Sequence, residues 1–248
     1  MRQTAAAGGT KRLGGLDSLR GAAFVSMTAY HACWDLVYLF RQNWDWYSSF
    51  GAYLWQQSIC WTFILLSGYC WALGRRKWRR GLITLGCGCL VSAVTLVCMP
   101  ENAVRFGVLT LLGAASLLTA ALSPLLARLD ARAGLAGSFA LFLLLRDVPE
   151  GFLGFEGARI AALPGAWYAN GLTAFLGFPP ADFFSTDYFP LLPWAFLFWC
   201  GYFLRRLRPE DAGALPRVPG LDALGRRSLL LYLLHQPVIY GVLMLLYT

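Results

Sequence analysis

Residues 51–73 read GAYLWQQSICWTFILLSGYCWAL, a stretch of 23 residues that holds no charged side chain. A helix that crosses the hydrocarbon core of a bilayer needs about 20 mainly apolar residues. The length and apolarity of this stretch therefore predict a membrane-spanning helix. The same pattern recurs on both sides of it, so the chain is expected to cross the membrane several times.

Six further apolar segments join the first, and together they predict an all-α, polytopic membrane helix bundle of about seven transmembrane helices. They are Gly21–Phe40, Gly81–Met99, Phe106–Ala127, Ala133–Leu145, Tyr188–Leu204 and Ser228–Tyr247. Ala133–Leu145 has only 13 residues, so six spans are the alternative. We expect one integral membrane domain over residues 1–248, in which residues 1–12 form a flexible N-terminal segment.

Composition excludes several classes of protein. Apolar residues make up 58% of the chain and charged residues 14%, where soluble domains average about 45–50% and 25%. So few charges argue against an ordinary soluble enzyme and against disorder. The formal net charge of +8 suggests nucleic acid, but membrane topology accounts for the basic residues, so we expect no nucleic-acid partner. The seven cysteines show no zinc-type spacing, and we expect no metal.

Orientation follows from the distribution of Lys and Arg. With seven spans and a cytoplasmic N-terminus, 17 of the 21 basic residues lie inside and 4 outside. The long connection 146–187 then lies outside. It is rich in Gly, Pro and aromatic residues, and we interpret it as a lid or interfacial segment over the external mouth of the bundle. The expected location is the bacterial cytoplasmic (inner) membrane.

Three ionisable side chains within the spans are candidates for catalysis. His31 lies 11 residues after Arg20, roughly 16 Å along a helix and near mid-membrane. Asp35 follows one turn later on the same face, and His235 lies at a similar depth in the last span. Ionisable groups at such depth are costly and usually functional. The functional reading is an intramembrane general base oriented by a second group; the alternative is a pair of neutral histidines that fix helix packing.

Further polar residues mark the two ends of the bundle. Outside, Gln57, Arg105 and Asp187 form a possible vestibule for a hydroxyl or amine, unless they are simply solvated. Inside, Asp17 and Arg20 are candidates for the cofactor site. Either Asp17 caps the first helix and Arg20 snorkels, or Arg20 faces the bundle and binds phosphate. Arg75 and Arg76 belong to a basic run that either sets topology and contacts anionic lipid or holds the phosphates of a nucleotide-bearing cofactor.

Four motifs resemble the small bacterial branch of the heparan-alpha-glucosaminide N-acetyltransferase catalytic-domain family, within the transmembrane acyltransferases. The motifs are LDSLRG at 16–21 followed by Met27 and HACWD at 31–35, VRFGVL at 104–109, DYFPLLPW at 187–194 and GRRSLLLYLLHQP at 225–237. The resemblance runs from about Arg12 to the end of the chain. One departure is Thr110, where the family leads us to expect histidine.

The resemblance implies transfer of an acetyl group from cytosolic acetyl-CoA to a hydroxyl or amine of a sugar-like acceptor on the far side. It implies His31 as the general base, oriented by Asp35, and Arg20 near the cofactor's entry. The resemblance also implies that the acceptor pocket is lined by Arg105, Asp187, His235 and Gln236. We add two candidates for the same pocket, Gln57 and the motif tryptophan Trp194. Heparan itself is not implied, because the small branch of the family lacks the extra helices and the luminal domain of the lysosomal enzyme.

Other functions remain open at this point. A transporter or lipid scramblase would also place His and Asp at mid-membrane beside a helix kinked at Pro237. A structural protein would use the same residues for packing, and an acyltransferase-3-type O-acetylase shares the opening motif. The expected partners are the lipid bilayer and a small-molecule or glycan acceptor. A homodimer is plausible, because aromatic-rich spans offer large packing faces.

Overall fold

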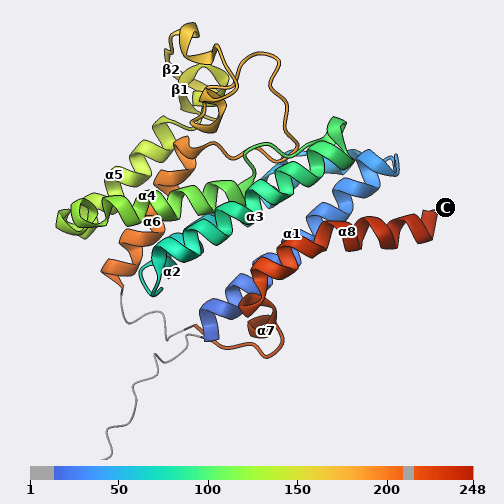
Figure 1. Cartoon of the computed structure of the whole chain (residues 1–248), viewed down its shortest axis with the longest axis horizontal. Helices are drawn as coiled ribbons and strands as arrows, with labels where there is room; N and C mark the ends of the chain where they lie inside the picture. The colour runs from blue at the N-terminus through green and yellow to red at the C-terminus, as the bar shows by residue number, and fades with distance from the viewer. Residues whose placement is uncertain (1–13, 209–214, 248) are drawn as a thin grey trace, which may run out of the picture.

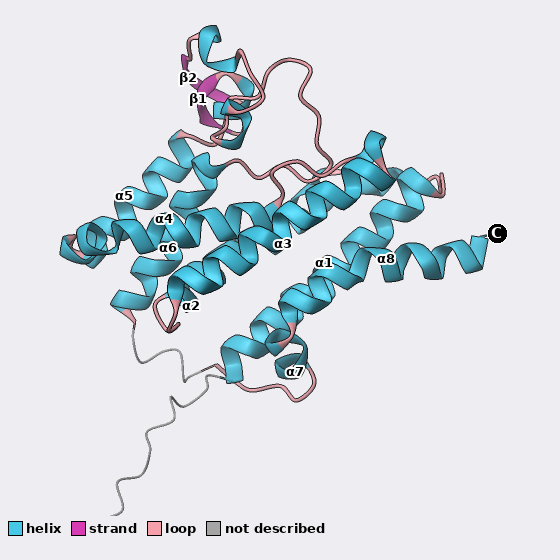
Figure 2. Ribbon diagram, viewed as in Figure 1, coloured by secondary structure: helices cyan, strands magenta, loops and turns pink. Residues whose placement is uncertain are grey.

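A computed structural model describes residues 14–208 and 215–247, which form a helix bundle with one small β-hairpin (Figures 1 and 2). The expected flexible segment 1–12 lies outside the described residues. The α-helices are α1 (Gly14–Trp34), α2 (Phe50–Trp71), α3 (Lys77–Cys98), α4 (Val108–Arg128), α5 (Ala131–Leu144), α6 (Leu191–Leu207), α7 (Leu221–Arg226) and α8 (Ser228–Tyr247). Short 3-10 turns are η2 (Asp45–Ser48), η3 (Pro100–Asn102), η4 (Val148–Glu150), η5 (Gly165–Tyr168) and η6 (Thr173–Phe175).

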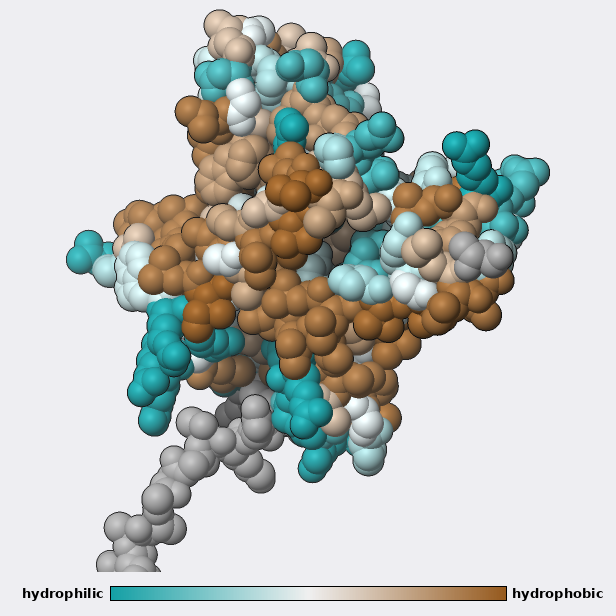
Figure 3. All heavy atoms as spheres, turned by 45° about the vertical axis from the view of Figure 1, so that its right-hand side comes forward, coloured by the Kyte–Doolittle hydropathy of each residue, from teal (hydrophilic) through white to brown (hydrophobic). Residues whose placement is uncertain are grey.

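The long helices coincide with the seven expected spans to within a few residues, except that α1 begins seven residues before Gly21, at Gly14. Within the described residues, α3, α4 and α8 are long and apolar enough to cross a membrane by those properties alone. The helix α5 is apolar but has only 14 residues. Figure 3 shows apolar surface across the middle of one face and hydrophilic residues above and below it. Seven spans and a cytoplasmic N-terminus stay predictions.

Two local elements depart from the expected pattern, one at the end of a helix and one in the external connection. Helix α1 continues directly into a π-helical turn, η1 (Asp35–Leu39), where the Phe40 N–H donates to the Asp35 carbonyl at 2.9 Å. Such turns are rare and are frequently found at functional sites. In the long external connection, strands β1 (Phe152–Phe155) and β2 (Ala158–Ala162) pair antiparallel, with an irregularity between Leu153 and Gly154.

The hairpin departs from the all-α prediction, and glycine explains why. Gly151, Gly154 and Gly157 adopt φ values of 91°, 157° and 88°, which side chains with a Cβ rarely adopt. The Asp147 carboxylate accepts the Glu156 and Gly157 N–H groups at 2.9 and 2.8 Å and so fixes the turn. The hairpin stands beyond the end of α5 (Figure 1).

Glycine contacts hold the bundle together at two crossings. A Cβ on Gly68 of α2 would lie 1.8 Å from the Phe198 carbonyl of α6, so these backbones touch. A Cβ on Gly225 of α7 would lie 1.8 Å from the Asp17 carbonyl of α1. Helix α6 thus packs between α2 and α5, and its Phe198 and Phe203 fill the core. The α3–α4 pair faces α1 and α8 without close packing between the two pairs, and this leaves space inside the bundle.

Candidate functional site

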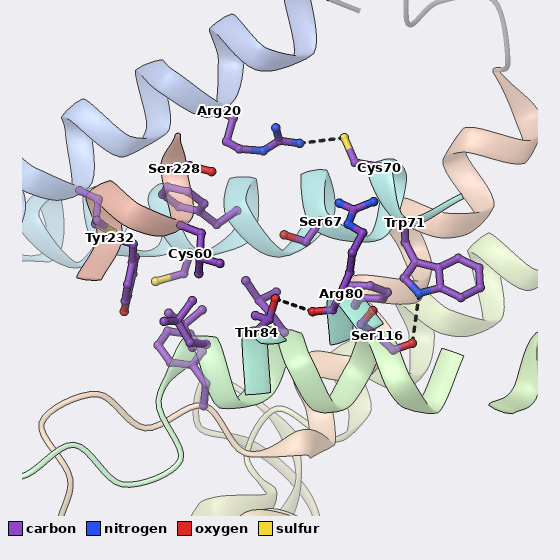
Figure 4. A pocket seen from close by; sticks show the side chains of 18 of the residues that line it. Arg20, Cys60, Ser67, Cys70, Trp71, Arg80, Thr84, Ser116, Ser228 and Tyr232 are labelled. Carbon is purple, nitrogen blue, oxygen red and sulfur yellow. Dashed lines mark hydrogen bonds between the residues drawn. The ribbon is translucent and has the colours of Figure 1, made fainter. Parts of the chain in front are cut away.

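A cavity of about 480 Å³ lies inside the bundle, walled by one face of each surrounding helix. Helix α2 contributes residues three or four apart along one face, among them Cys60, Phe63, Ser67 and Cys70. Helices α1, α3, α4, α6, α7 and α8 contribute further faces, and Figure 4 shows the labelled side chains converging from them. The walls are mainly apolar, and charged side chains lie at the two ends.

Four basic side chains line one end of the cavity, called here the basic end: Arg20, Lys77, Arg80 and Arg226. Figure 4 shows Arg20 and Arg80 reaching into the space between α1, α2 and α3. An Arg20 Nη donates to Cys70 Sγ at 3.0 Å, and the other Nη pairs with Asp17 at 2.9 Å. Lys77 Nζ lies 3.9 Å from the centre of the Trp71 ring. This end is therefore suited to an anion beside an aromatic ring.

Asp222 holds Arg226, the cation that α7 contributes to the basic end, in place. Its buried carboxylate pairs with Arg217 at 2.5 Å and with Arg226 at 2.7 Å. The hydrogen bond from Arg217, reinforced by Arg226, holds the pKa of Asp222 below its usual value. Asp222 therefore stays anionic and keeps Arg226 at the basic end of the cavity.

Asp187 lines the opposite end, called here the acidic end, together with Cys60, Tyr232 and Phe189. Its Oδ2 accepts the Val108 N–H at 3.1 Å and so caps the N-terminus of α4. Burial raises the pKa of Asp187 to about 6, and the hydrogen bond from Val108 opposes that shift. A carboxylate with such a pKa is ionised near neutrality and is a stronger base than an exposed one.

A separate group, called here the α1–α8 polar cluster, consists of His31, Asp35, His235 and Gln236. The two imidazole centroids lie 5.0 Å apart. Asp35 is fully buried, and its Oδ1 accepts from Gln236 Nε2 at 2.5 Å. The structure thus places the two histidines, for which the sequence indicated only a similar depth, in contact, but none of the four residues is among those that line the cavity.

His235 connects the polar cluster with the cavity wall through Tyr232. Its Nδ1 lies 2.5 Å from the Tyr232 carbonyl oxygen. A carbonyl only accepts, so Nδ1 carries the proton and Nε2 holds a lone pair. That Nε2, Asp35 Oδ2 and Gln236 Oε1 are buried without a hydrogen-bond partner. Such orphaned atoms are uncommon in stable cores and require an explanation.

The remaining predicted site residues lie elsewhere. Gln57 Oε1 accepts from Trp61 at 3.2 Å and from Arg146 at 3.4 Å. Arg146 also pairs with Glu156 and lies 4.7 Å from the ring centre of the buried Trp194. Gln57 and Trp194 thus form a second outer group with the hairpin, away from the cavity lining.

Arg105, Arg75 and Arg76 are exposed and do not line the cavity. Thr110, which replaces the expected histidine, is buried against α3, where a Cβ on Gly88 would lie 2.6 Å from its Oγ1. Packing accounts for this position.

Among the cavity residues that sequence reasoning did not single out are Cys60, Arg226 and Tyr232, and it included Lys77 and Arg80 only as members of the basic run 75–80. A usable signal was present for the last two. Lys77, Arg80 and Thr84 are spaced i, i+3 and i+7, so they share one helix face. The predicted pair Arg75 and Arg76 precedes α3, and Arg76 adopts a left-handed backbone conformation with φ 55°. The sequence did not show that α3 begins at Lys77, and this start decides which basic side chains of the run face the cavity.

Comparison with known proteins identifies the family. The family model of the heparan-alpha-glucosaminide N-acetyltransferase catalytic domain matches residues 12–237. Searches of curated proteins and of solved structures each gave no match. The match covers nearly the whole chain, including both ends of the cavity and the α1–α8 polar cluster. The chain therefore belongs to the heparan-alpha-glucosaminide N-acetyltransferase catalytic-domain family, a family of transmembrane acetyltransferases.

Proposed function

We propose that this chain transfers an acetyl group from acetyl-CoA, bound from the basic end of the cavity, to a hydroxyl or amine of a sugar-like acceptor at the acidic end. The observation that carries the proposal is one cavity with cations at one end and the half-buried carboxylate of Asp187 at the other. Family membership supports the reaction class. The family name specifies a heparan glucosaminide, but the proposal extends only to the class of acceptor.

The residues at the basic end fit the donor. Coenzyme A carries several phosphates, for which guanidinium and ammonium groups are the usual partners. Arg20 and Arg226 are held in place by Asp17 and Asp222. Lys77 and Arg80 form none of the ion pairs found among the described residues, so their charges are available to a ligand. When bound, acetyl-CoA supplies an acetyl group activated as a thioester.

The cavity walls fit the remainder of that donor. Phe63, Ile83 and Leu112 form apolar walls between the two ends. The hydroxyls of Ser67, Thr84 and Ser116 lie along the same walls and can meet amide groups (Figure 4). Cys60 and Cys70 lie ten residues apart on α2, so the two ends are separated by about 15 Å along that helix.

Two groups are candidates for the base that accepts the acceptor's proton. His31 is the candidate from sequence, because it is expected at mid-membrane, belongs to a motif shared with the family and lies beside the ring of His235. Asp187 is the candidate from geometry, because it lines the cavity itself. In either case, proton transfer from the acceptor accompanies formation of its bond to the acetyl carbon and departure of the thiol.

The test is an acetyl-transfer assay with protein in proteoliposomes, acetyl-labelled acetyl-CoA and a panel of amino sugars and glycans. Transfer to any of them, inhibited by desulfo-CoA, supports the function. A large loss in His31→Ala alone identifies His31 as the base, and a large loss in Asp187→Asn alone identifies Asp187. Solute flux without consumption of acetyl-CoA contradicts the proposal and favours a transporter.

Three further expectations belong to this proposal. The basic end faces the cytosol, in accord with the distribution of Lys and Arg. The membrane is the bacterial inner membrane. The chain acts as a homodimer in that bilayer. Thiol labelling from each side of sealed vesicles, and the mass of the purified protein, test the first and the last of these.

A further inference from the structure

A groove of about 460 Å³ lies on the opposite side of α2 from the cavity, between α2, α5 and α6. It forms because α2 and α5 both pack against α6 but hardly touch each other along most of their length. They meet at one point, where the rings of Trp61 and Phe142 lie 5.0 Å apart. Trp61, one of the two rings of that contact, lines the groove.

One stripe of α5 supplies the charged end of the groove. Gly134, Ser138 and Phe142 form the buried face of α5, and a Cβ on Gly134 would lie 2.4 Å from the Phe203 ring of α6. The neighbouring stripe, Arg132, Leu135, Ala136 and Phe139, lines the groove at helical spacing. Apart from Arg132 the described lining is apolar, so the groove has one charged end, at Arg132, and otherwise apolar walls.

Arg132 lies in a basic neighbourhood. The Arg206 guanidinium donates to the carbonyls of Leu126 and Leu129 at 2.9 and 3.1 Å, which joins the C-terminal ends of α4 and α6. Arg128 and Arg205 therefore lie near the same end of the bundle. The nearby acid, Asp130, accepts the Arg132 and Ala133 N–H groups and caps α5. Among the described residues of this neighbourhood, four arginines (Arg128, Arg132, Arg205 and Arg206) outnumber this one carboxylate, so the net local charge favours an anion.

We propose that this groove holds one acyl chain of an anionic phospholipid from the surrounding bilayer, with the lipid phosphate on Arg132. An apolar groove accommodates a hydrocarbon chain, and an arginine at its end is a partner for a lipid phosphate. The volume lies within the range of about 300–1,000 Å³ that is usual for small-molecule sites.

The test is native mass spectrometry of the full chain in mild detergent, with phosphatidylglycerol and phosphatidylcholine of identical acyl chains. Wild type should retain one phosphatidylglycerol in preference to phosphatidylcholine. Ala136→Trp, which fills the groove, should abolish retention of either lipid. Arg132→Ala should lower affinity for phosphatidylglycerol about tenfold or more and remove the preference, because one charge-assisted contact is lost.

Two matched variants serve as controls. Leu141→Trp adds the same bulk on an exposed part of α5 outside the groove, and Arg128→Ala removes a nearby arginine that does not line it. Both should retain lipid as wild type does. Equal retention by wild type and Ala136→Trp overturns the proposal. So does a change from dimer to monomer in Ala136→Trp with lipid retention unchanged, which would make the groove a contact between two copies of the chain.

A second measurement requires no bulky substitution. Trp61 lines the groove, so brominated phosphatidylglycerol should quench part of the tryptophan fluorescence of wild type. The quenched fraction should fall in Trp61→Phe. An unchanged quenched fraction in that variant contradicts occupation of the groove by lipid.

Discussion

The cavity and the α1–α8 polar cluster both hold ionisable side chains inside the helix bundle, but they hold them differently. In the cavity, charged groups line an open volume and two of the four cations have no acidic partner in the described chain. In the polar cluster, Asp35 and Gln236 form a hydrogen bond with each other. Asp35 Oδ2, Gln236 Oε1 and His235 Nε2 are buried there without a hydrogen-bond partner among the described residues. The cavity is therefore suited to a ligand. The polar cluster joins α1 and α8 and leaves Nε2 of His235 without a hydrogen bond.

For an ionisable side chain, depth in the membrane and access to a substrate are separate properties. The ionisable pair that sequence depth picks out lies between helices, whereas Asp187, from a loop, reaches the cavity. Tyr232 is where the two regions meet, since its carbonyl binds His235 and the residue lines the cavity. The following predictions separate the two regions.

The largest effect is expected from Asp187→Asn. An asparagine retains an oxygen that can cap α4 but is not a base, so folding should persist while acetyl transfer falls by about 10²–10⁴-fold. Asp182→Asn, at an exposed position in the same loop, is the control and should leave the rate unchanged. A wild-type rate in Asp187→Asn would move the chemistry to the polar cluster.

The pH dependence of transfer should carry the same signature. If Asp187 is the base, the rate should fall about tenfold per pH unit below about 6, because burial raises its pKa to about 6. The raised pKa makes the folded state take up this proton before the unfolded state does. Asp187 therefore adds stability as the pH falls from about 6 toward 3.8, so its own titration does not explain lost activity by unfolding. A rate–pH profile beside thermal unfolding at each pH checks both statements.

Arg80→Ala should weaken acetyl-CoA binding by roughly tenfold to a hundredfold, the value of one charge-assisted contact to phosphate. Arg75→Ala removes an equivalent charge five residues away, outside the cavity, and should change binding little. Calorimetric titration of the two variants makes the comparison. Equal losses would mean that the basic run acts through its total charge.

The smallest effect on activity is expected in the polar cluster. Gln236→Leu leaves the buried Asp35 carboxyl without its donor and should lower stability by about 1–3 kcal/mol, read as an earlier thermal transition. Gln56→Leu, at a half-buried amide on α2, is the matched control. The double variant Asp35→Leu/Gln236→Leu should recover most of the loss, because both polar partners are removed. If instead Gln236→Leu abolishes transfer and leaves stability intact, the cluster is part of the active site.

Much of the fold could be predicted from the sequence. Uncharged runs such as 51–73 and 228–247 are long enough to define helices α2 and α8 by themselves. The sequence also assigned a similar depth to His31 and His235, whose ring centroids lie 5.0 Å apart in the structure. These inferences need only the rise per residue of one helix and the thickness of the bilayer.

The cavity could not be predicted in the same way, because it depends on how helices pack. Arg80 lines it because α3 begins at Lys77 and turns that face toward α2, whereas Arg75 lies before the helix. Asp187 reaches it because its carboxylate caps α4, a contact between residues 79 positions apart. The hairpin at 152–162 depends on glycines in left-handed conformations, which a hydropathy pattern does not reveal.

The central claim is that the donor occupies the cavity and not the polar cluster, and the native cysteines test it directly. Cys60 and Cys70 line the cavity, Cys33 lies on α1 between His31 and Asp35, and Cys89 and Cys98 are exposed. Alkylation of each thiol should be measured by peptide mass spectrometry with and without saturating desulfo-CoA. The account predicts protection of Cys60 and Cys70 alone, and loss of that protection in Arg80→Ala. Protection of Cys33, with Cys60 and Cys70 still reactive, would contradict it.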